Sequence, residues 1–169
     1  MKHAKSRKLK LSRIFSIFFL VLFALSFPYP AGAEFVQAPG FSEVDIQGNR
    51  QSLEQYRGKF VVLYFWATWC SWCRKDTKAM IEVFKTYHPK GVEFISVSLD
   101  QDLAKLQKFV NEHHVPYPVI FEGEGWENKI VQLYGIEATP SFILIDPQGQ
   151  VRSGGGSSEE LKEELAQFR

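Results

Sequence analysis

Hydrophobic residues gather along the chain in runs that have the pattern of buried β-strands. Residues 59–67 (KFVVLYFWA) and 92–100 (VEFISVSLD) are nearly continuous apolar runs rich in β-formers, which predict strands buried on both faces. The shorter run at 117–121 (YPVIF) predicts a third strand, and residues 141–153 (SFILIDPQGQVRS) predict a hairpin. The aromatic residues that we assign to the core of this sheet are Phe60, Phe65, Trp66, Phe94 and Phe142.

Helical spacing appears between the predicted strands. Residues 80–88 (MIEVFKTYH) place apolar side chains three or four positions apart, until a Pro-Lys-Gly sequence ends the helix. Residues 102–114 (DLAKLQKFVNEHH) predict a second amphipathic helix, and residues 125–136 (GWENKIVQLYGI) predict a third that Gly135 ends. Residues 157–168 (SSEELKEELAQF) predict a last helix, with one of its two serines as the N-cap and acids in its first turn.

The two ends of this region complete the fold prediction. Residues 41–53 (FSEVDIQGNRQSL) predict a small hairpin ahead of the main sheet, and the glycine-rich residues 153–157 predict a loop too short to link two domains. Strands and helices otherwise alternate through short connections. Residues 34–169 therefore predict one α/β domain, with a mixed central sheet covered by helices on both faces.

The first 33 residues differ in kind from this domain and have the parts of an export signal. Residues 1–13 carry six Lys and Arg and no acid, residues 14–27 are an uncharged apolar run, and Ala31 and Ala33 form an A-x-A site. The apolar run is shorter than the about 20 residues that span a bilayer, which favours a signal peptide cleaved after Ala33. An uncleaved signal anchor, held in the membrane through residues 14–27, is the alternative. Both interpretations predict an exported protein, in the periplasm or at the outer face of the cytoplasmic membrane.

The charge of the domain disfavours nucleic acid as a partner. Residues 34–169 contain 14 Lys and Arg against 19 Asp and Glu, a net charge of −5. The basic excess of the chain thus belongs to the export signal, and no Lys and Arg stripe remains to neutralise phosphates.

Both cysteines of the chain, Cys70 and Cys73, lie in the segment WATWCSWCRKD. Exported proteins meet an oxidising compartment, where an idle surface thiol pair would be a liability. A structural zinc site needs four ligands, and the domain adds only His88, His113 and His114 at unsuitable spacing. A purely structural disulfide across two residues would close a tiny loop and stabilise little through chain entropy. The pair therefore predicts a chemical role that needs no metal and no cofactor.

Two redox reactions remain for this pair. Thiol peroxidases share this kind of sheet, but their pattern P-x-x-x-T-x-x-C is not met by the residues that precede Cys70. A CxxC between a buried strand and a helix places its first sulfur at the helix N-terminus, where free N–H groups and the macrodipole favour a thiolate. Cys70 is then the attacking nucleophile, and Cys73 resolves the mixed disulfide. Dithiol/disulfide exchange is the favoured function, with a thiol peroxidase and a non-catalytic binding module as alternatives.

The segment KFVVLYFWATWCSWCR resembles the active site of the thioredoxin superfamily, and its pattern GKxVVLxFWATWCxxCR is most similar to the exported TlpA/ResA branch. The resemblance covers residues 41–165. It implies a thioredoxin fold with an extra helix–strand unit between Cys73 and Pro140, similar to the central insertion of that branch. It also implies that Thr139 and Pro140 form the family's cis-proline dipeptide and lie beside the cysteines, where they bind substrate.

The resemblance further implies the partners of such an enzyme. Oxidised proteins are the expected substrates, apocytochrome c among them, so that the protein would act as a reductant in cytochrome c biogenesis. The expected electron donor is a membrane-embedded thiol transporter of the DsbD/CcdA type. Trp69 and Trp72, which adjoin the cysteines, are expected to form the rim of the substrate groove.

Departures from the family pattern leave the proton acceptor for Cys73 open. Thioredoxin carries a buried Asp on the strand before its cysteines, and Tyr64 stands in that place here. The related exported reductases often carry an acid or a proline between the cysteines, where this chain has Ser-Trp. Glu137, shortly before the expected cis-proline, is the nearest acid by motif position, and solvent or Lys59 are the alternatives.

Overall fold

The computed structural model describes residues 36–167 of the 169-residue chain. The segment 1–33, expected to be a signal peptide or a signal anchor, lies outside the described residues. Within the part that is described, no helix is long and apolar enough to cross a membrane.

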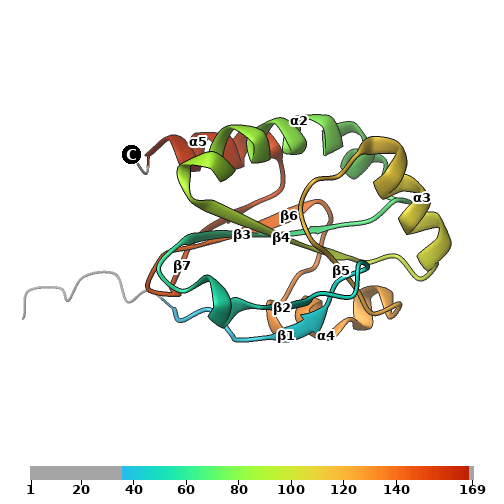
Figure 1. Cartoon of the computed structure of the whole chain (residues 1–169), viewed down its shortest axis with the longest axis horizontal. Helices are drawn as coiled ribbons and strands as arrows, with labels where there is room; N and C mark the ends of the chain where they lie inside the picture. Colours follow the sequence, from blue (N-terminus) through green and yellow to red (C-terminus); the bar gives the residue numbers. More distant parts are fainter. Residues whose placement is uncertain (1–35, 168–169) are drawn as a thin grey trace, which may run out of the picture. The chain divides into compact units, whose positions relative to one another are not determined.

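A five-stranded mixed sheet forms the centre of the described domain (Figure 1). Its order is β5-β4-β3-β6-β7, in which β3, β4 and β5 run parallel and β6 pairs antiparallel with both β3 and β7. The strands are β3 (Phe60–Trp66), β4 (Val92–Ser98), β5 (Val119–Phe121), β6 (Ser141–Ile145) and β7 (Val151–Gly155). The predicted mixed sheet is confirmed.

Both faces of this sheet are covered, as predicted (Figure 1). Helices α2, α3 and α5 lie over one face, while α4 and the hairpin β1–β2 lie over the other. The crossovers β3-α2-β4 and β4-α3-β5 advance in the same direction along the sheet, so their right-handedness puts both helices on one face. The bounds are α2 (Ser71–Tyr87), α3 (Leu103–His113), α4 (Lys129–Leu133), α5 (Ser158–Gln167), β1 (Ser42–Val44) and β2 (Arg50–Ser52). Short 3₁₀ helices are η1 (Leu53–Tyr56), η2 (His88–Lys90) and η3 (Gly125–Glu127).

The unit α3–β5 is the extra helix–strand unit that the family resemblance implied. β5 pairs with β4 in parallel, and Ser96 lies opposite Val119. The hairpin β1–β2 meets this strand, because the Ile46 N–H donates to the Val119 carbonyl oxygen at 2.9 Å. The insertion therefore extends the sheet beyond β4 and gives the N-terminal hairpin a strand on which to dock.

The core forms around β3, which is buried from Val61 to Trp66. Both faces of this strand are buried because helices lie over one face and α4 with the hairpin over the other, as a continuous apolar run requires. Of the predicted core aromatics, four are at most 3% exposed, namely Phe65, Trp66, Phe94 and Phe142. Phe60, at the start of the strand, is half-buried.

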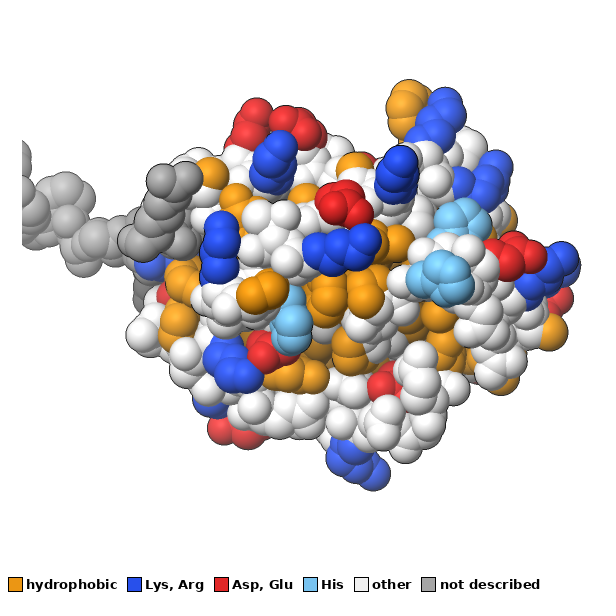
Figure 2. All heavy atoms as spheres, turned by 45° about the horizontal axis from the view of Figure 1, so that its top comes forward, with side chains coloured by type: hydrophobic (Ala, Val, Ile, Leu, Met, Phe, Trp, Pro, Cys, Tyr) orange, Lys and Arg blue, Asp and Glu red, His pale blue; other side chains and the backbone are white. Residues whose placement is uncertain are grey.

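The helical face carries charges of both signs (Figure 2). Lys85 pairs with Glu82 on α2 at 2.9 Å, and Lys108 pairs with Glu112 on α3 at 3.8 Å. Exposed pairs of this kind contribute about 0.3–0.5 kcal/mol each, so they contribute little to holding the fold together.

The single helix predicted for residues 125–136 is wrong, because the segment is divided at Asn128 into η3 and α4. The backbone of Asn128 is not helical, with φ −53° and ψ 132°. Its buried side-chain oxygen accepts hydrogen bonds from the N–H groups of Ile130 at 2.9 Å and Val131 at 3.1 Å. Asn128 therefore caps a new helix instead of continuing the first one.

The loop predicted for residues 153–157 is also corrected. Its first half belongs to β7, where Gly155 lies opposite Phe142 and Gly154 opposite Ile143. A Cβ on Gly155 would lie 2.7 Å from the ring of Phe142. The glycine thus permits close packing of the strand against this ring, and the composition of the stretch is misleading as a loop signal.

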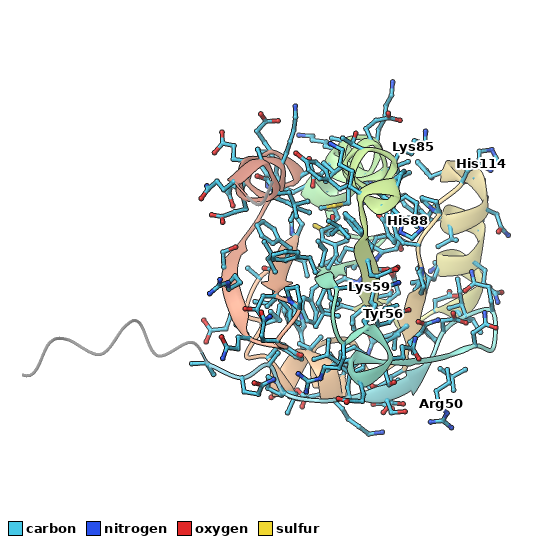
Figure 3. The ribbon with its side chains drawn as sticks, turned by 60° about the vertical axis from the view of Figure 1, so that its left-hand side comes forward. Arg50, Tyr56, Lys59, Lys85, His88 and His114 are labelled. Carbon is cyan, nitrogen blue, oxygen red and sulfur yellow. A yellow bond between two sulfur atoms is a disulfide. The ribbon has the colours of Figure 1, made fainter. Side chains whose placement is uncertain are left out.

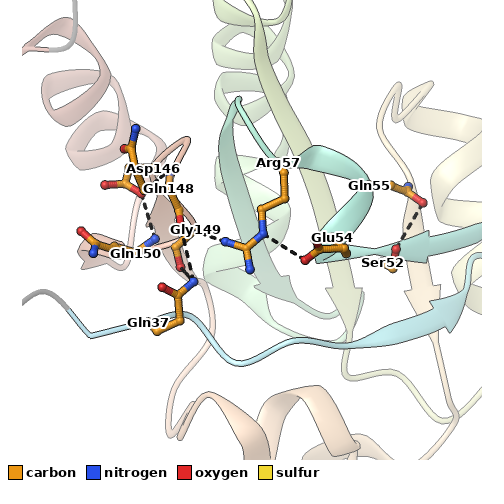
Figure 4. A network of polar contacts seen from close by, with 9 residues as sticks. All are labelled: Gln37, Ser52, Glu54, Gln55, Arg57, Asp146, Gln148, Gly149 and Gln150. Carbon is orange, nitrogen blue, oxygen red and sulfur yellow. Dashed lines mark hydrogen bonds and ion pairs between the residues drawn. The ribbon is translucent and has the colours of Figure 1, made fainter.

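Polar contacts tie two segments to the β6–β7 turn: Gln37, near the start of the described residues, and Arg57, which follows η1 (Figure 4). Arg57 donates to the carbonyl oxygen of Gln148 at 2.8 Å, and Gln37 donates to that of Gly149 at 2.7 Å. Asp146 closes the turn itself, because its Oδ1 accepts from two backbone N–H groups within it at 2.9 and 2.8 Å. Gly149 has φ 80°, and a Cβ there would lie 2.6 Å from the Gln37 amide nitrogen.

Substitution of Gly155 tests the packing of β7. Gly155→Ala should lower the free energy of unfolding by about 1–3 kcal/mol, since the new methyl group collides with the Phe142 ring. Gly156→Ala is the matched control: its Cβ would lie 3.4 Å from the Pro140 carbonyl oxygen, an ordinary contact, and the change should stay within about 0.5 kcal/mol. Urea unfolding followed by tryptophan fluorescence measures both, and equal stabilities for the two variants would contradict the packing argument.

Candidate active site

Cys70 and Cys73 lie where β3 ends and α2 begins, as the sequence predicts. Cys70 is the N-cap of α2, and the Cys73 N–H points to its Sγ at 3.1 Å. The two cysteines form a disulfide, with Cα atoms 5.2 Å apart. The first sulfur therefore lies at the positive end of a 17-residue helix, where a thiolate is stabilised.

The two cysteines differ in their access to solvent. Cys70 is 7% exposed, whereas Cys73 is fully buried at 0%. An external disulfide can approach only a sulfur that reaches the surface. The geometry thus favours Cys70 as the attacking residue and Cys73 as the residue that attacks from inside.

Thr139 and Pro140 are brought to the cysteines by the pairing of two strands. β3 and β6 run antiparallel with Phe65 opposite Ser141, so the chain just before β6 meets the chain just after β3. The carbonyl oxygen of Thr139 lies 3.5 Å from the Sγ of Cys70. The Thr139–Pro140 peptide bond is cis, which confirms the expected conformation.

A groove opens beside Pro140. Its lining residues are Trp72, Lys75, Asp76, Pro140, Gly156 and Ser157. Trp72 is 68% exposed, and the ammonium group of Lys75 lies 4.7 Å from the centroid of its ring. The groove thus joins an exposed aromatic side chain to the segment that faces Cys70.

Trp69 is also exposed, at 53%, but it is fixed by two other elements. Its indole N–H donates to the carbonyl oxygen of Leu99 at 3.3 Å, and its ring lies 6.4 Å from that of Trp126. Sequence reasoning missed Trp126, which is 39% exposed in η3. No local signal marks this residue, since only the placement of β5 next to β4 brings its loop toward Trp69.

Tyr64, which stands in the place of thioredoxin's buried acid, cannot serve as a base. It is 3% exposed, and its hydroxyl has no hydrogen-bond partner among residues 36–167. Burial raises the pKa of Tyr64 far above its usual value, and nearby Tyr117 and Asp76 raise it further. The phenol therefore stays neutral at physiological pH.

The prediction that Lys59 could accept the Cys73 proton is wrong. Lys59 lies just before the first residue of β3, whereas the cysteines follow the last residue of this strand. Seven strand residues, at about 3.3 Å each, separate the two ends. Figure 3 shows Lys59 close to Tyr56 and His88. Its ammonium group donates to Glu93, and this hydrogen bond raises the pKa of Lys59, so it stays protonated.

Two carboxylates lie closer to the motif. Glu137 is exposed, and within the described part of the chain no hydrogen bond or ion pair holds its carboxylate. Asp76, which sequence reasoning did not single out, lies one turn after Cys73 on α2 and lines the groove. It accepts hydrogen bonds from the backbone N–H of Ser158, at 3.0 Å, and from the Ser158 hydroxyl. The spacing of three residues from Cys73 was the signal that could have found it.

Comparison with known proteins places this site in a family. The profile of the AhpC/TSA family matches residues 36–153. The chain belongs to this family. The thiol-disulfide oxidoreductase ResA of Bacillus thuringiensis subsp. konkukian is 33% identical over 132 residues, which cover 78% of this chain and 74% of that protein. The ResA protein of Geobacillus thermodenitrificans is 30% identical over 135 residues, 78% of this chain and 76% of that protein.

Solved structures agree with the fold of this AhpC/TSA-family protein. The thioredoxin domain of a thiol-disulfide oxidoreductase from Bacteroides vulgatus superposes with a TM-score of 0.72 at 27% identity, over 82% of this chain and 99% of that one. A thiol:disulfide interchange protein from Bacteroides sp. gives 0.70 at 27% identity, over 80% and 90%. The predicted thioredoxin fold and thiol-disulfide oxidoreductase activity are confirmed, and the protein is an enzyme of this class.

Removal of the Tyr64 hydroxyl tests its role. Tyr64→Phe should leave the exchange rate unchanged and raise the free energy of unfolding by about 1 kcal/mol, because an unpaired buried hydroxyl is removed. The matched control is Tyr134→Phe. The Tyr134 hydroxyl donates to the Pro39 carbonyl oxygen at 2.7 Å, so its removal should lower the free energy of unfolding by about 1 kcal/mol. Insulin reduction and urea unfolding measure the two effects, and a large loss of activity in Tyr64→Phe would show that the phenol takes part in the exchange.

Proposed function

We propose that this AhpC/TSA-family enzyme is an exported reductant of protein disulfides that works through Cys70 and Cys73. One arrangement carries the proposal: Cys70 caps α2 at the surface, with its sulfur 3.5 Å from the Thr139 carbonyl oxygen and an open groove alongside. Cys73 lies buried directly behind it. This is the geometry that a nucleophile and a resolving thiol need.

The reaction proceeds in two exchanges. The Cys70 thiolate attacks one sulfur of the substrate disulfide, that bond breaks, and the other substrate sulfur leaves as a thiolate that takes up a proton. Cys73 then loses its proton and attacks the Cys70 sulfur of the mixed disulfide, which releases the second substrate thiol. The enzyme ends with the Cys70–Cys73 disulfide, and two electrons and two protons have passed to the substrate.

Substrate recognition is assigned to four residues around the sulfur. Thr139 offers its backbone to an extended substrate segment, and Pro140, which has no N–H, leaves no competing donor there. Trp72 and Trp69, both more than half exposed, flank the cysteine pair and contact the substrate side chains. Glu137 remains the proposed acceptor for the Cys73 proton, with solvent as the alternative.

Location and partners complete the proposal. Residues 1–33 act as a signal peptide or a signal anchor, which delivers residues 34–169 to the periplasm or to the outer face of the cytoplasmic membrane. A membrane-embedded thiol transporter returns the electrons, and oxidised proteins, apocytochrome c among them, receive them. The similarity to ResA thiol-disulfide oxidoreductases supports the exchange chemistry on which this assignment rests.

Serine substitutions test the order of the two attacks. Cys70→Ser should abolish insulin reduction, because no surface thiol remains, while Cys73→Ser should accumulate covalent mixed disulfides that dithiothreitol releases. Non-reducing gel electrophoresis detects the trapped species. Full turnover by the Cys70→Ser protein would overturn the assignment, and faster consumption of hydrogen peroxide than of insulin by the wild type would favour a peroxidase instead.

The redox potential tests the direction of electron flow. A reductant should equilibrate with glutathione toward the thioredoxin end of the range between about −270 and −120 mV. Tryptophan fluorescence is the readout, since Trp69 and Trp72 adjoin the cysteines. A value near the oxidising end would contradict the reductase assignment and leave the exchange chemistry intact.

A further inference from the structure

We infer that the buried carboxylate of Asp100 is a positioning residue for Cys70, which it holds in place through Thr68. The inference rests on the proposed function, because it concerns the sulfur that attacks the substrate. Asp100 comes two residues after the end of β4, and Thr68 comes two residues before Cys70. Thr68 lies in the segment that resembles the family's active site, Asp100 lies outside it, and neither residue lines the groove.

The contact between Asp100 and Thr68 crosses from one strand to its neighbour. The Asp100 carboxylate accepts a hydrogen bond from the Thr68 N–H at 2.9 Å and a second from the Thr68 hydroxyl. The hydroxyl of Ser98 donates to the same carboxylate at 2.8 Å. β3 and β4 are parallel with Trp66 opposite Ser98, so the loops that leave the two strands lie side by side.

Thr68 is held from a second direction by the active-site helix. Its carbonyl oxygen accepts from the guanidinium group of Arg74 on α2 at 2.8 Å. Together with the two bonds to Asp100, this contact engages the N–H, the hydroxyl and the carbonyl group of Thr68. We call Asp100, Thr68 and Arg74 the Thr68 clamp. It fixes the start of the turn between β3 and the N-cap of α2, and so the direction in which Cys70 projects.

Two other buried aspartates show that this arrangement is not ordinary turn support. Asp45 is 6% and Asp146 is 3% exposed, and each accepts from backbone N–H groups two and four residues further along, which closes its own hairpin. Asp100 is equally buried, at 3%, but it holds a residue 32 positions away, just before the nucleophile. A buried carboxylate is costly unless hydrogen bonds compensate it, and here two of them come from Thr68 in the active-site turn and one from Ser98 on β4.

The clamp matters most for a substrate that cannot reorient freely. Attack on a disulfide needs the sulfur in line with the bond that breaks, and small displacements lower the rate strongly. A disulfide in a protein is held by the segment that binds along Thr139, whereas a small disulfide turns to meet the thiolate wherever it lies. Loss of the Thr68 clamp should therefore slow the reduction of protein disulfides more than the reduction of small disulfides.

Single-turnover rates of the reduced full-length protein test this selectivity. Asp100→Ala should slow the reduction of insulin at least about tenfold and that of Ellman's reagent less than about threefold, measured on the high-pH plateau where Cys70 is fully ionised. The plateau removes any effect of the lost charge on thiol ionisation. The amide oxygen of Asp100→Asn can still accept from the Thr68 N–H and the Ser98 hydroxyl, and its NH2 group can donate to the Thr68 hydroxyl, so this variant should stay within about threefold of the wild type with both substrates.

The control is Asp146→Ala, which removes an equally buried acid from another turn. It should lower the free energy of unfolding without changing the ratio of the two rates. If Asp100→Ala does not fold, Thr68→Val, which loses the hydroxyl bond and keeps the backbone bond, should show the same selective loss at smaller size.

Two results would overturn the inference: equal slowing of both substrates by the folded clamp variant, or the same selectivity in Asp146→Ala. A wild type that reduces neither substrate would instead refute the proposed function itself. The two failures are thus distinguishable.

Discussion

The burial of β3 between β4 and β6 is the constraint on which the active site depends. A strand covered on both faces and paired on both edges cannot shift against its neighbours without exposing apolar side chains or breaking backbone hydrogen bonds. Its carboxyl end is therefore a fixed point. The register with β4 brings the Asp100 loop to that point, and the register with β6 brings Thr139 there. Cys70 comes four residues after the end of β3, so the position of this strand end also sets the position of Cys70.

The electrostatics of the site come mainly from backbone groups. The Cys70 sulfur lies at the N-terminus of α2, where the Cys73 N–H meets it at 3.1 Å. Where thioredoxin has a buried acid, this chain has the neutral phenol of Tyr64. Stabilisation of the attacking thiolate thus depends on the helix N-terminus, and the neutral phenol of Tyr64 offers no base for the Cys73 proton.

The surface around the sulfur is unusually aromatic for an exposed region. Trp69, Trp72 and Trp126 are each more than a third exposed, and Trp69 packs against Trp126. Large exposed aromatic side chains mark contact surfaces, because they combine much buriable apolar area with little rotamer entropy. Their position next to Cys70 fits an enzyme whose substrates are proteins, since a small disulfide would need no such area.

The sequence by itself determined the alternation of strands and helices, the mixed sheet and the cysteine pair at a strand-to-helix junction. These follow from hydrophobic spacing and local capping, which act over a few residues and can be read directly. Two local predictions failed. The helical spacing of residues 125–136 hid a cap at Asn128, whose side chain starts a new helix. The glycines at 153–157 predicted a loop, but the ring of Phe142, a tertiary neighbour, selects glycine within a strand.

Only the tertiary structure decided what surrounds Cys70. No local pattern marks Asp100 or Trp126, and both lie far along the chain from Cys70. The segments that meet at the end of β3 are set by strand order and register, and these depend on the burial of the whole sheet rather than on any short stretch of residues. For the same reason the cysteine pair could be predicted from the sequence, but the Asp100 carboxylate that holds the turn before it could not.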